Sequence, residues 1–485
     1  MSALASSSPS RRRVTLGALL QIVVRLIGLV AGAVVAAVQA RTLSVAEFGV
    51  FSTILLLCGI AQALSDLGLT NVTVKRIAID PDSAPFHAAA LLQARLAIGC
   101  VTSLLAFGLS VLLLGQFGDV LAAALVLASV PIGTVGTLQA VPIAKLELGV
   151  QNILLLVQSA TWLIIVLVLG ALSADLLQFA IGFFAASVIQ ALVVWRLVAR
   201  RVKPQFRSGF RHLINLMSES LPLGIGGLGV TAYFRVGGIV LFSTWGAEQA
   251  AYLSGATRVL EVAQAIPASI LGPLLPLLSA SLTAQNKAKA KAVWAFAERL
   301  VAASSLMVVA GVVALAPDVI RVLYGDRYEQ TILVLQVLIF SFVPICIGWL
   351  TTSAIIASGA YRAYATVTLV TAAFSVVAAM LVIPVWGAIG TAFVTLGTES
   401  VVAAALLAVA RRRSGLVSQM SVWLRSVAAA ALTGGALVLI PGFGEPIVDL
   451  LVKTAIGVVV GAILLLAMRV VTYAHISSAL HRREV

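Results

Sequence analysis

Four arginines inside long apolar stretches are the residues of this sequence best suited to bind a ligand. They are Arg25, Arg95, Arg235 and Arg258. An ionised side chain in such a stretch usually faces protein or a water-filled cavity, because lipid disfavours its charge. A guanidinium group binds phosphate oxygens through paired hydrogen bonds, and a low dielectric strengthens that attraction. We therefore predict that these arginines contribute to a cationic site for an anionic substrate.

The same arginines also have a purely structural interpretation. Arg258 and Glu261 are three residues apart on one helix face, so they could simply form an ion pair. Arg95 lies near the end of its stretch and could extend its guanidinium to the membrane surface. Arg25 and Arg235 lie deeper, about 16 Å and 21 Å from the start of their stretches at about 1.5 Å per residue. These two arginines suit a site within the membrane best.

Three acidic residues in apolar stretches are candidates for ion coupling. They are Asp66, Glu261 and Glu399. Asp66 could complete a site for a coupling ion or could stabilise helix packing. Glu399 could be protonated and deprotonated during transport. Both interpretations of Asp66 stay open.

The composition shows what kind of element must position these residues. The chain has 485 residues, of which 61% are hydrophobic and only 10% charged. A soluble protein could not bury so much apolar surface, so lipid must surround it. With about 20 apolar residues per crossing, the sequence predicts an all-α polytopic membrane protein of about fourteen transmembrane helices. The net charge of +14 does not indicate nucleic-acid binding, because the basic residues cluster in short loops between apolar stretches.

The distribution of Lys and Arg predicts the orientation. Loops on the predicted inner side include basic runs at 11–13, 196–211, 287–291 and 411–413, whereas loops on the predicted outer side hold only Arg41, Arg321, Arg327 and Lys453. Cytoplasmic loops carry such an excess of basic residues, so both termini are predicted to be cytoplasmic. The first apolar stretch, 14–40, is too long for a signal peptide and is predicted to be retained.

The basic run at 200–211 separates two groups of apolar stretches. We predict an N-terminal six-helix lobe over residues 1–205, a second six-helix lobe over 206–415, and two further helices over 416–485. The first stretch after the run is rich in helix breakers, namely Pro222, Gly224, Gly226, Gly227 and Gly229. They indicate either a helix that bends during transport or close packing through small residues.

Signatures of catalysis are missing from the sequence. It contains no Walker A loop, no H-E-x-x-H and no G-x-S-x-G, and the cysteines lack metal or redox spacing. We therefore predict no catalytic residues, no metal site, no cofactor and no enzyme activity. Energy for transport would come from an ion gradient, the membrane potential or downhill flow.

Several short motifs, in a fixed order, resemble those of a known family. They are Arg41-Thr42-Leu43-Ser44-Val45-Ala46-Glu47-Phe48-Gly49-Val50-Phe51, Ser65-Asp66-Leu67-Gly68-Leu69, Leu221-Pro222, Ala251-Tyr252-Leu253-Ser254-Gly255-Ala256, Ile320-Arg321-Val322-Leu323-Tyr324-Gly325-Asp326-Arg327-Tyr328 and Trp386-Gly387-Ala388-Ile389-Gly390-Thr391-Ala392. The set resembles the polysaccharide exporters, the Wzx-type flippases of the multidrug/oligosaccharidyl-lipid/polysaccharide (MOP) superfamily. Many relatives place an acid after the arginine of the seventh span, but this chain has Val236-Gly237-Gly238.

The resemblance implies two six-helix lobes around a central cavity, with two additional C-terminal helices outside this core. It implies a flippase that moves an isoprenoid-diphosphate-linked oligosaccharide, or another precursor of a cell-surface polysaccharide such as O-antigen of lipopolysaccharide, from the inner to the outer leaflet by alternating access. The diphosphate head would bind the arginines. The protein would lie in the bacterial plasma membrane, among lipids and possible partner enzymes of glycan assembly.

Three other functions stay open. A lipid II flippase would carry a closely related substrate. A cation-coupled multidrug antiporter of the same superfamily would prefer an acidic cavity, which the four arginines argue against. A polytopic enzyme such as a polysaccharide polymerase would need catalytic groups and usually a large external loop, and the sequence has neither.

Overall fold

A computed structural model describes residues 11–206, 210–267, 287–357, 360–416, 418–442 and 444–470, with the single residues 271, 278, 280 and 281. In these ranges all regular elements are helices, which confirms the predicted all-α class. The chain forms two compact units, Met1–Thr231 and Ala232–Val485. The lobe boundaries placed at residues 205 and 415 from the charge pattern stay predictions.

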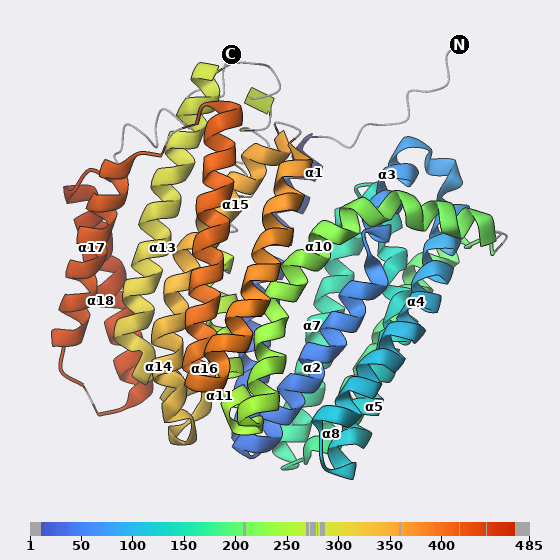
Figure 1. The fold of residues 1–485 in the computed structure, drawn as a ribbon, viewed down its shortest axis with the longest axis horizontal. Helices are drawn as coiled ribbons and strands as arrows, with labels where there is room; N and C mark the ends of the chain where they lie inside the picture. The colour runs from blue at the N-terminus through green and yellow to red at the C-terminus, as the bar shows by residue number, and fades with distance from the viewer. Residues whose placement is uncertain are drawn as a thin grey trace. The chain divides into compact units, whose positions relative to one another are not determined.

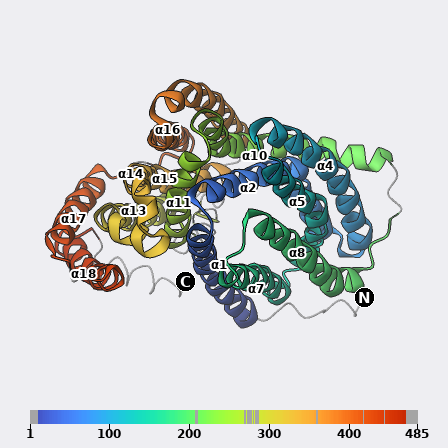
Figure 2. The ribbon, with the colours of Figure 1, turned by 90° about the horizontal axis from the view of Figure 1, so that it is seen from below.

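The first unit is a bundle of long helices. They are α1 (Arg11–Thr42), α2 (Val45–Asp66), α3 (Leu69–Ile79), α4 (Ala84–Leu113), α5 (Phe117–Gly133), α6 (Ala140–Ala144), α7 (Leu148–Ala171), α8 (Leu176–Val194), α9 (Arg200–Val202) and the first part of α10 (Phe210–Trp245). Helix α1 packs on α7, α7 on α8, α8 on α5, and α5 on both α4 and α2. Figure 2 views these helices end-on, with α1, α7, α8, α5 and α2 following one another around a ring.

Local sequence sets the ends of these helices. Helix α2 begins at a capping box, in which the Ser44 side chain accepts from the Glu47 backbone N–H and the Glu47 carboxylate accepts from the Ser44 backbone N–H. It ends at a turn formed by Leu67 and Gly68, whose φ angles are 40° and 79°. Helix α5 contains Pro131 and continues as a 3-10 segment over Thr134–Gln139. Because proline removes a backbone donor, the regular α-helix gives way at this point.

The second unit contains the rest of α10 and the helices that follow. These are α11 (Ala247–Ala263), α13 (Lys287–Tyr324), α14 (Glu329–Leu338), α15 (Phe342–Ala357), α16 (Tyr361–Ser414), α17 (Met420–Leu439) and α18 (Pro446–Ala467), labelled in Figure 1. Helix α16 breaks at Gly387, where φ is 58° and ψ is −136°. The break is held by Gln249, whose Oε1 accepts from the Ala388 backbone N–H at 3.2 Å, and by Trp245, whose Nε1 donates to the Ile383 carbonyl at 3.0 Å.

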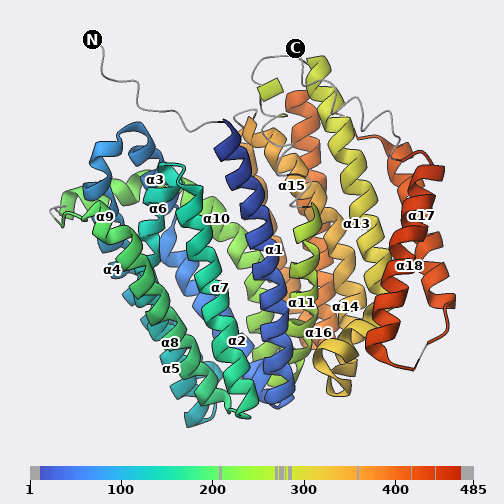
Figure 3. The ribbon, with the colours of Figure 1, turned by 180° about the vertical axis from the view of Figure 1, so that it is seen from behind.

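Two polar contacts fasten α17 and α18 to α13. The buried carboxylate of Glu298 accepts from the Gln419 backbone N–H at 3.0 Å, from Trp423 Nε1 at 2.9 Å and from the Ser418 hydroxyl. Further along α13, Lys453 pairs with Asp318 at 3.2 Å, and both side chains are largely buried. Figure 3 shows α17 and α18 beside each other and next to α13. Helix α17 is therefore anchored to α13 through Glu298, and helix α18 is anchored to α13 through Asp318.

Within the described ranges, eleven helices are long and apolar enough to cross a membrane. One of these is the 54-residue α16, which consists of two helical segments joined at the break at Gly387. A shorter apolar helix covers 26–42 of α1. The chain is thus a multi-pass membrane protein, while the count of fourteen crossings stays a prediction.

Gly224 lies where helix α10 closely approaches the turn between α2 and α3 in the first unit. A Cβ added there would lie 2.4 Å from the Leu67 carbonyl oxygen, whereas one added at Gly227 would meet no heavy atom within 4 Å. On the same helix, Glu219 forms an ion pair with Arg76 of α3. The first part of α10 is thus fitted against the α2–α3 turn, as the small-residue interpretation of this segment requires.

We expect Gly224→Ala to lower the free energy of unfolding by about 1–3 kcal/mol, the usual cost of overpacking. The matched control Gly227→Ala should be neutral or slightly stabilising, since alanine favours a helix over glycine by up to about 1 kcal/mol. Thermal unfolding of the two detergent-purified variants measures the difference. Equal midpoints for both variants would show that α10 does not pack closely on the Leu67 turn.

Candidate functional site

A cavity of about 440 Å³ lies inside the first unit. One wall is the small-residue face of α1, formed by Gly28, Ala31, Gly32 and Val35. These positions follow the i, i+3, i+4, i+7 spacing of one helix face. Because their side chains are small, they leave room between α1 and the helices opposite.

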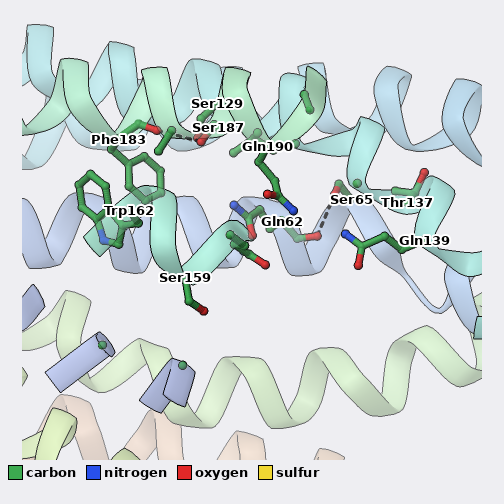
Figure 4. Close-up of a pocket in the computed structure, with 18 of the residues that line it drawn as sticks. Gln62, Ser65, Ser129, Thr137, Gln139, Ser159, Trp162, Phe183, Ser187 and Gln190 are labelled. Atoms are coloured by element: carbon green, nitrogen blue, oxygen red, sulfur yellow. Dashed lines mark hydrogen bonds between the residues drawn. The ribbon is translucent and has the colours of Figure 1, made fainter. Parts of the chain in front are cut away.

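The other walls carry uncharged polar side chains and two aromatic rings (Figure 4). The polar residues are Gln62 and Ser65 of α2, Ser129 of α5, Thr137 and Gln139 of the 3-10 segment, Gln158 and Ser159 of α7, and Ser187 and Gln190 of α8. In Figure 4, Trp162 and Phe183 lie together at one end of the cavity and Thr137 and Gln139 at the other. The two rings pack edge to face with centroids 5.3 Å apart.

Arg95 of α4 contributes the charged group of this wall. Its Nη1 lies 3.2 Å from Asp66 Oδ1, and its Nη2 donates to the Ser65 hydroxyl at 3.3 Å. Thr70, at the start of α3, donates its hydroxyl to the same Asp66 oxygen. The turn at Leu67 and Gly68 thus places Asp66 where it can hold Arg95 at the cavity wall. The structure therefore brings two predicted residues, Arg95 and Asp66, together.

Three polar atoms of the lining residues have no hydrogen-bond partner among the described residues. They are Gln190 Oε1, Thr137 Oγ1 and Arg95 Nε. Gln190 is oriented by its Nε2, which donates to the Leu154 carbonyl at 3.5 Å. Buried polar groups are usually hydrogen-bonded, so atoms of this kind indicate a place where a ligand could bond.

The other predicted arginines lie elsewhere. The backbone of Arg25 is in α1, but its side chain lies outside the described residues. Arg235 is half-buried on the α10 segment of the second unit. Arg258 is 46% exposed on α11, and its Nη1 donates to Glu261 Oε2 at 2.8 Å, so the ion pair considered from their spacing is present.

Glu399 has a different setting from the other two acids. The Glu399 residue on α16 is buried, with 4% exposed, whereas the side chains of Glu261 and Asp66 are 47% and 30% exposed. Tyr233 of α10 hydrogen-bonds the Glu399 carboxyl group. The other carboxyl oxygen, Oε1, has no hydrogen-bond partner among the described residues. A buried carboxyl group with one open oxygen is well placed to exchange a proton or hold a cation.

The uncharged polar residues that line the cavity were not predicted, because only ionisable residues stand out within apolar stretches. Their signal is nevertheless present, since Phe183, Ser187 and Gln190 recur at helical spacing within an apolar stretch. The residues Gln158, Ser159 and Trp162 show the same kind of stripe on α7. A search for polar stripes inside spans would have found them.

Two of the family-like motifs meet as packing elements in the second unit. Tyr324 Oη donates to the Gly255 carbonyl at 3.2 Å, and Tyr324 and Tyr328 have ring centroids 5.5 Å apart. Tyr252 packs edge to face on Tyr328 at 6.2 Å. A Cβ on Gly255 would lie 3.3 Å from the Tyr324 ring, so the glycine permits this close packing.

Comparisons with known proteins agree with this architecture. A family model described as "Polysaccharide biosynthesis protein" matches residues 14–282, more than half of the chain. No curated protein sequence matches the chain.

Solved structures share the fold at low sequence identity. The lipid II flippase MurJ, in an inward closed conformation, is 14% identical with a TM-score of 0.74, and the match covers 92% of this chain and 98% of that one. An inward-facing multidrug resistance MATE family transporter of the MOP superfamily is 16% identical, with a TM-score of 0.65 and coverage of 80% and 94%. A MOP superfamily transporter from Pyrococcus furiosus, described as having a binding pocket of reverse polarity, is 15% identical, with a TM-score of 0.55 and coverage of 83% and 95%.

Proposed function

The chain belongs to the polysaccharide biosynthesis protein family, and on this basis we propose that it is a flippase for a lipid-linked glycan. The substrate is an isoprenoid-diphosphate-linked oligosaccharide or a related precursor of a cell-surface polysaccharide, such as O-antigen. It moves from the inner to the outer leaflet by alternating access. The observation that carries this proposal is the family match over residues 14–282. The multi-pass helical fold, shared with MOP superfamily transporters, supports it.

Arginines supply the affinity for the diphosphate in this proposal. Guanidinium groups of Arg25, Arg95, Arg235 and Arg258 attract its negative charge, and two or more of them neutralise it during transfer. Arg95 lies at a cavity wall where Asp66 offsets part of its charge, so the other arginines carry most of this attraction. Glu399 is the leading candidate for ion coupling, and Asp66 and Glu261, which pair with arginines, are the others.

The proposed location follows from the substrate and from the charge pattern. The chain lies in the bacterial plasma membrane with both termini in the cytoplasm, where the basic loops bias its orientation. Its partners are the lipid-linked glycan and the surrounding lipids, together with the glycan-assembly enzymes that supply the substrate.

Flipping by a variant at Arg235 tests the anion site. We expect Arg235→Ala to slow flipping of the lipid-linked oligosaccharide in proteoliposomes about tenfold or more, because a hydrogen bond to a charged group is worth about 1.5–3 kcal/mol. The control Arg362→Ala removes an exposed arginine of α16 and should flip at the parental rate. Equal rates for the folded Arg235→Ala protein and the parent would remove Arg235 from the substrate site.

A lipid II flippase is the second candidate function. The fold match to a lipid II flippase favours it, since that match covers 92% of this chain. Proteoliposomes containing lipid II separate the two candidates, because a lipid II flippase would transfer lipid II faster than the oligosaccharide carrier. A multidrug antiporter is disfavoured, because the described residues that line the cavity of the first unit include no carboxylate to attract a cationic drug.

A further inference from the structure

We propose that the cavity of the first unit binds neutral sugar rings of the transported glycan, apart from the diphosphate head. This inference rests on the proposed flippase function and names the part of the substrate that this cavity takes. It is carried by the chemistry of the lining, by its unpartnered polar atoms and by the shape of the space.

The charge of the lining excludes a strongly ionic ligand. Arg95 is the only ionisable residue among the described residues that line the cavity. Its charge is offset by Asp66 at 3.2 Å. A diphosphate would therefore find one partly neutralised cation, and a cationic ligand would find no free carboxylate. An uncharged polar ligand suits this wall best.

The hydrogen-bonding groups match those of a sugar. A glutamine amide offers two donors and a carbonyl acceptor, and each sugar hydroxyl both donates and accepts. Gln62, Gln139, Gln158 and Gln190 bring such amides from four different segments to one space. The Gln190 side chain is oriented by the hydrogen bond that its Nε2 donates to the Leu154 carbonyl, and its Oε1 has no protein donor among the described residues. A sugar hydroxyl would supply that missing donor.

The remaining walls fit the apolar face of a sugar ring. Trp162 and Phe183 form an aromatic surface at one end of the cavity (Figure 4), and an aromatic ring offers a flat apolar area beside polar groups. At the α1 wall, a Cβ at Gly32 would meet no heavy atom within 4 Å, so the space is open there. The cavity volume of about 440 Å³ lies within the range of about 300–1,000 Å³ that is usual for small-molecule sites.

Protection of an introduced cysteine tests the proposal. Ser159→Cys places a thiol in the cavity wall, and Cys100→Ser removes the exposed native thiol, since Cys58 and Cys346 are buried. The full-length protein in detergent is labelled with a water-soluble maleimide and followed by intact mass spectrometry. The probe is the neutral oligosaccharide, cut from its lipid diphosphate by mild acid. At a concentration of about ten times its Kd, the oligosaccharide leaves about one site in ten empty. Labelling should therefore slow about tenfold.

Two controls make the result specific. Labelling of Ser173→Cys, on the exposed turn between α7 and α8, should not change when the oligosaccharide is added. Inorganic diphosphate should not protect Ser159→Cys. Protection by diphosphate instead of the oligosaccharide would overturn the proposal in favour of an anion site, and protection by neither would overturn it outright.

A glutamine variant assigns the contact. Gln190→Leu should raise the Kd of the oligosaccharide about fivefold, the factor expected for one lost hydrogen bond. Gln116→Leu, an exposed position at the start of α5, is the matched control and should keep the parental Kd. If Gln190→Leu does not fold, Gln158→Leu on α7 takes its place with the same expectation. An unchanged Kd in both cavity variants would contradict the proposal.

Failure of the sugar-binding cavity can be distinguished from failure of the flippase function. Flipping of the lipid-linked oligosaccharide by the parental chain tests the function, whereas protection and the Kd of Gln190→Leu test the cavity. A chain that flips the substrate but shows no protection keeps its function and loses this site. A chain that shows protection but no flipping keeps a glycan-binding site and loses the flippase function.

Discussion

The Arg95→Ala variant is expected to lose about 2–3 kcal/mol of unfolding free energy, because Asp66 is then left without its cation in a membrane-spanning bundle. Breaking a fully buried ion pair costs about 3–5 kcal/mol, and Asp66 keeps 30% of its exposure, which reduces the cost. Thermal unfolding of the purified variant measures the loss. The same substitution should lower flipping about tenfold or more, since a hydrogen bond to a charged group is worth about 1.5–3 kcal/mol.

The double variant Arg95→Ala with Asp66→Ala separates stability from substrate binding. Removing both charges should restore much of the stability, because no unpaired charge remains. If Arg95 contacts the substrate, flipping stays low in this stable protein. If flipping returns together with stability, Arg95 only joins α4 to the α2–α3 turn. For stability, the exposed Arg258–Glu261 pair is the control, and its removal should cost no more than about 0.5 kcal/mol.

The Glu399→Gln variant is expected to lose the stimulation of flipping by a proton gradient. Its side chain is 4% exposed on α16, is bonded by Tyr233 and has one open oxygen, whereas glutamine keeps the shape and cannot take up and release the proton. The stimulated rate should fall about tenfold or more, which corresponds to about 1.4 kcal/mol. Flipping in proteoliposomes with and without an imposed pH gradient measures this effect.

Two further variants define the role of Glu399. Glu329→Gln, at an exposed position in the first turn of α14, should keep full stimulation. Glu261→Gln tests the competing candidate on α11. Stimulation that survives in Glu399→Gln and disappears in Glu261→Gln would transfer the coupling role to Glu261.

The fold was largely predictable because lipid imposes a simple pattern. Long apolar stretches with few charges must be helices in a membrane, and the structure confirms an all-α multi-pass protein. The match to the polysaccharide biosynthesis protein family confirms the resemblance drawn from the motifs. The Tyr324 and Gly255 motifs prove to be packing contacts, which sequence alone does not reveal.

The site was harder to predict because its geometry depends on contacts between distant segments. The pairing of Arg95 with Asp66 crosses from α4 to the end of α2 and depends on the left-handed turn at Leu67 and Gly68. Arg258 and Glu261 are neighbours on one helix, so their pair followed from spacing. The Gln190 side chain carries no charge, and only the structure shows its carbonyl open at a cavity.

Transfer of the lipid-linked oligosaccharide by the parental chain is the decisive measurement for the proposed flippase function. The full-length protein is reconstituted into proteoliposomes that contain the isoprenoid-diphosphate-linked oligosaccharide, and the glycan that reaches the opposite leaflet is measured with an enzyme that cannot cross the membrane. We expect this transfer to be faster than in protein-free vesicles and faster than the transfer of lipid II. Transfer no faster than in protein-free vesicles, in a preparation shown to be folded, would contradict the proposed function.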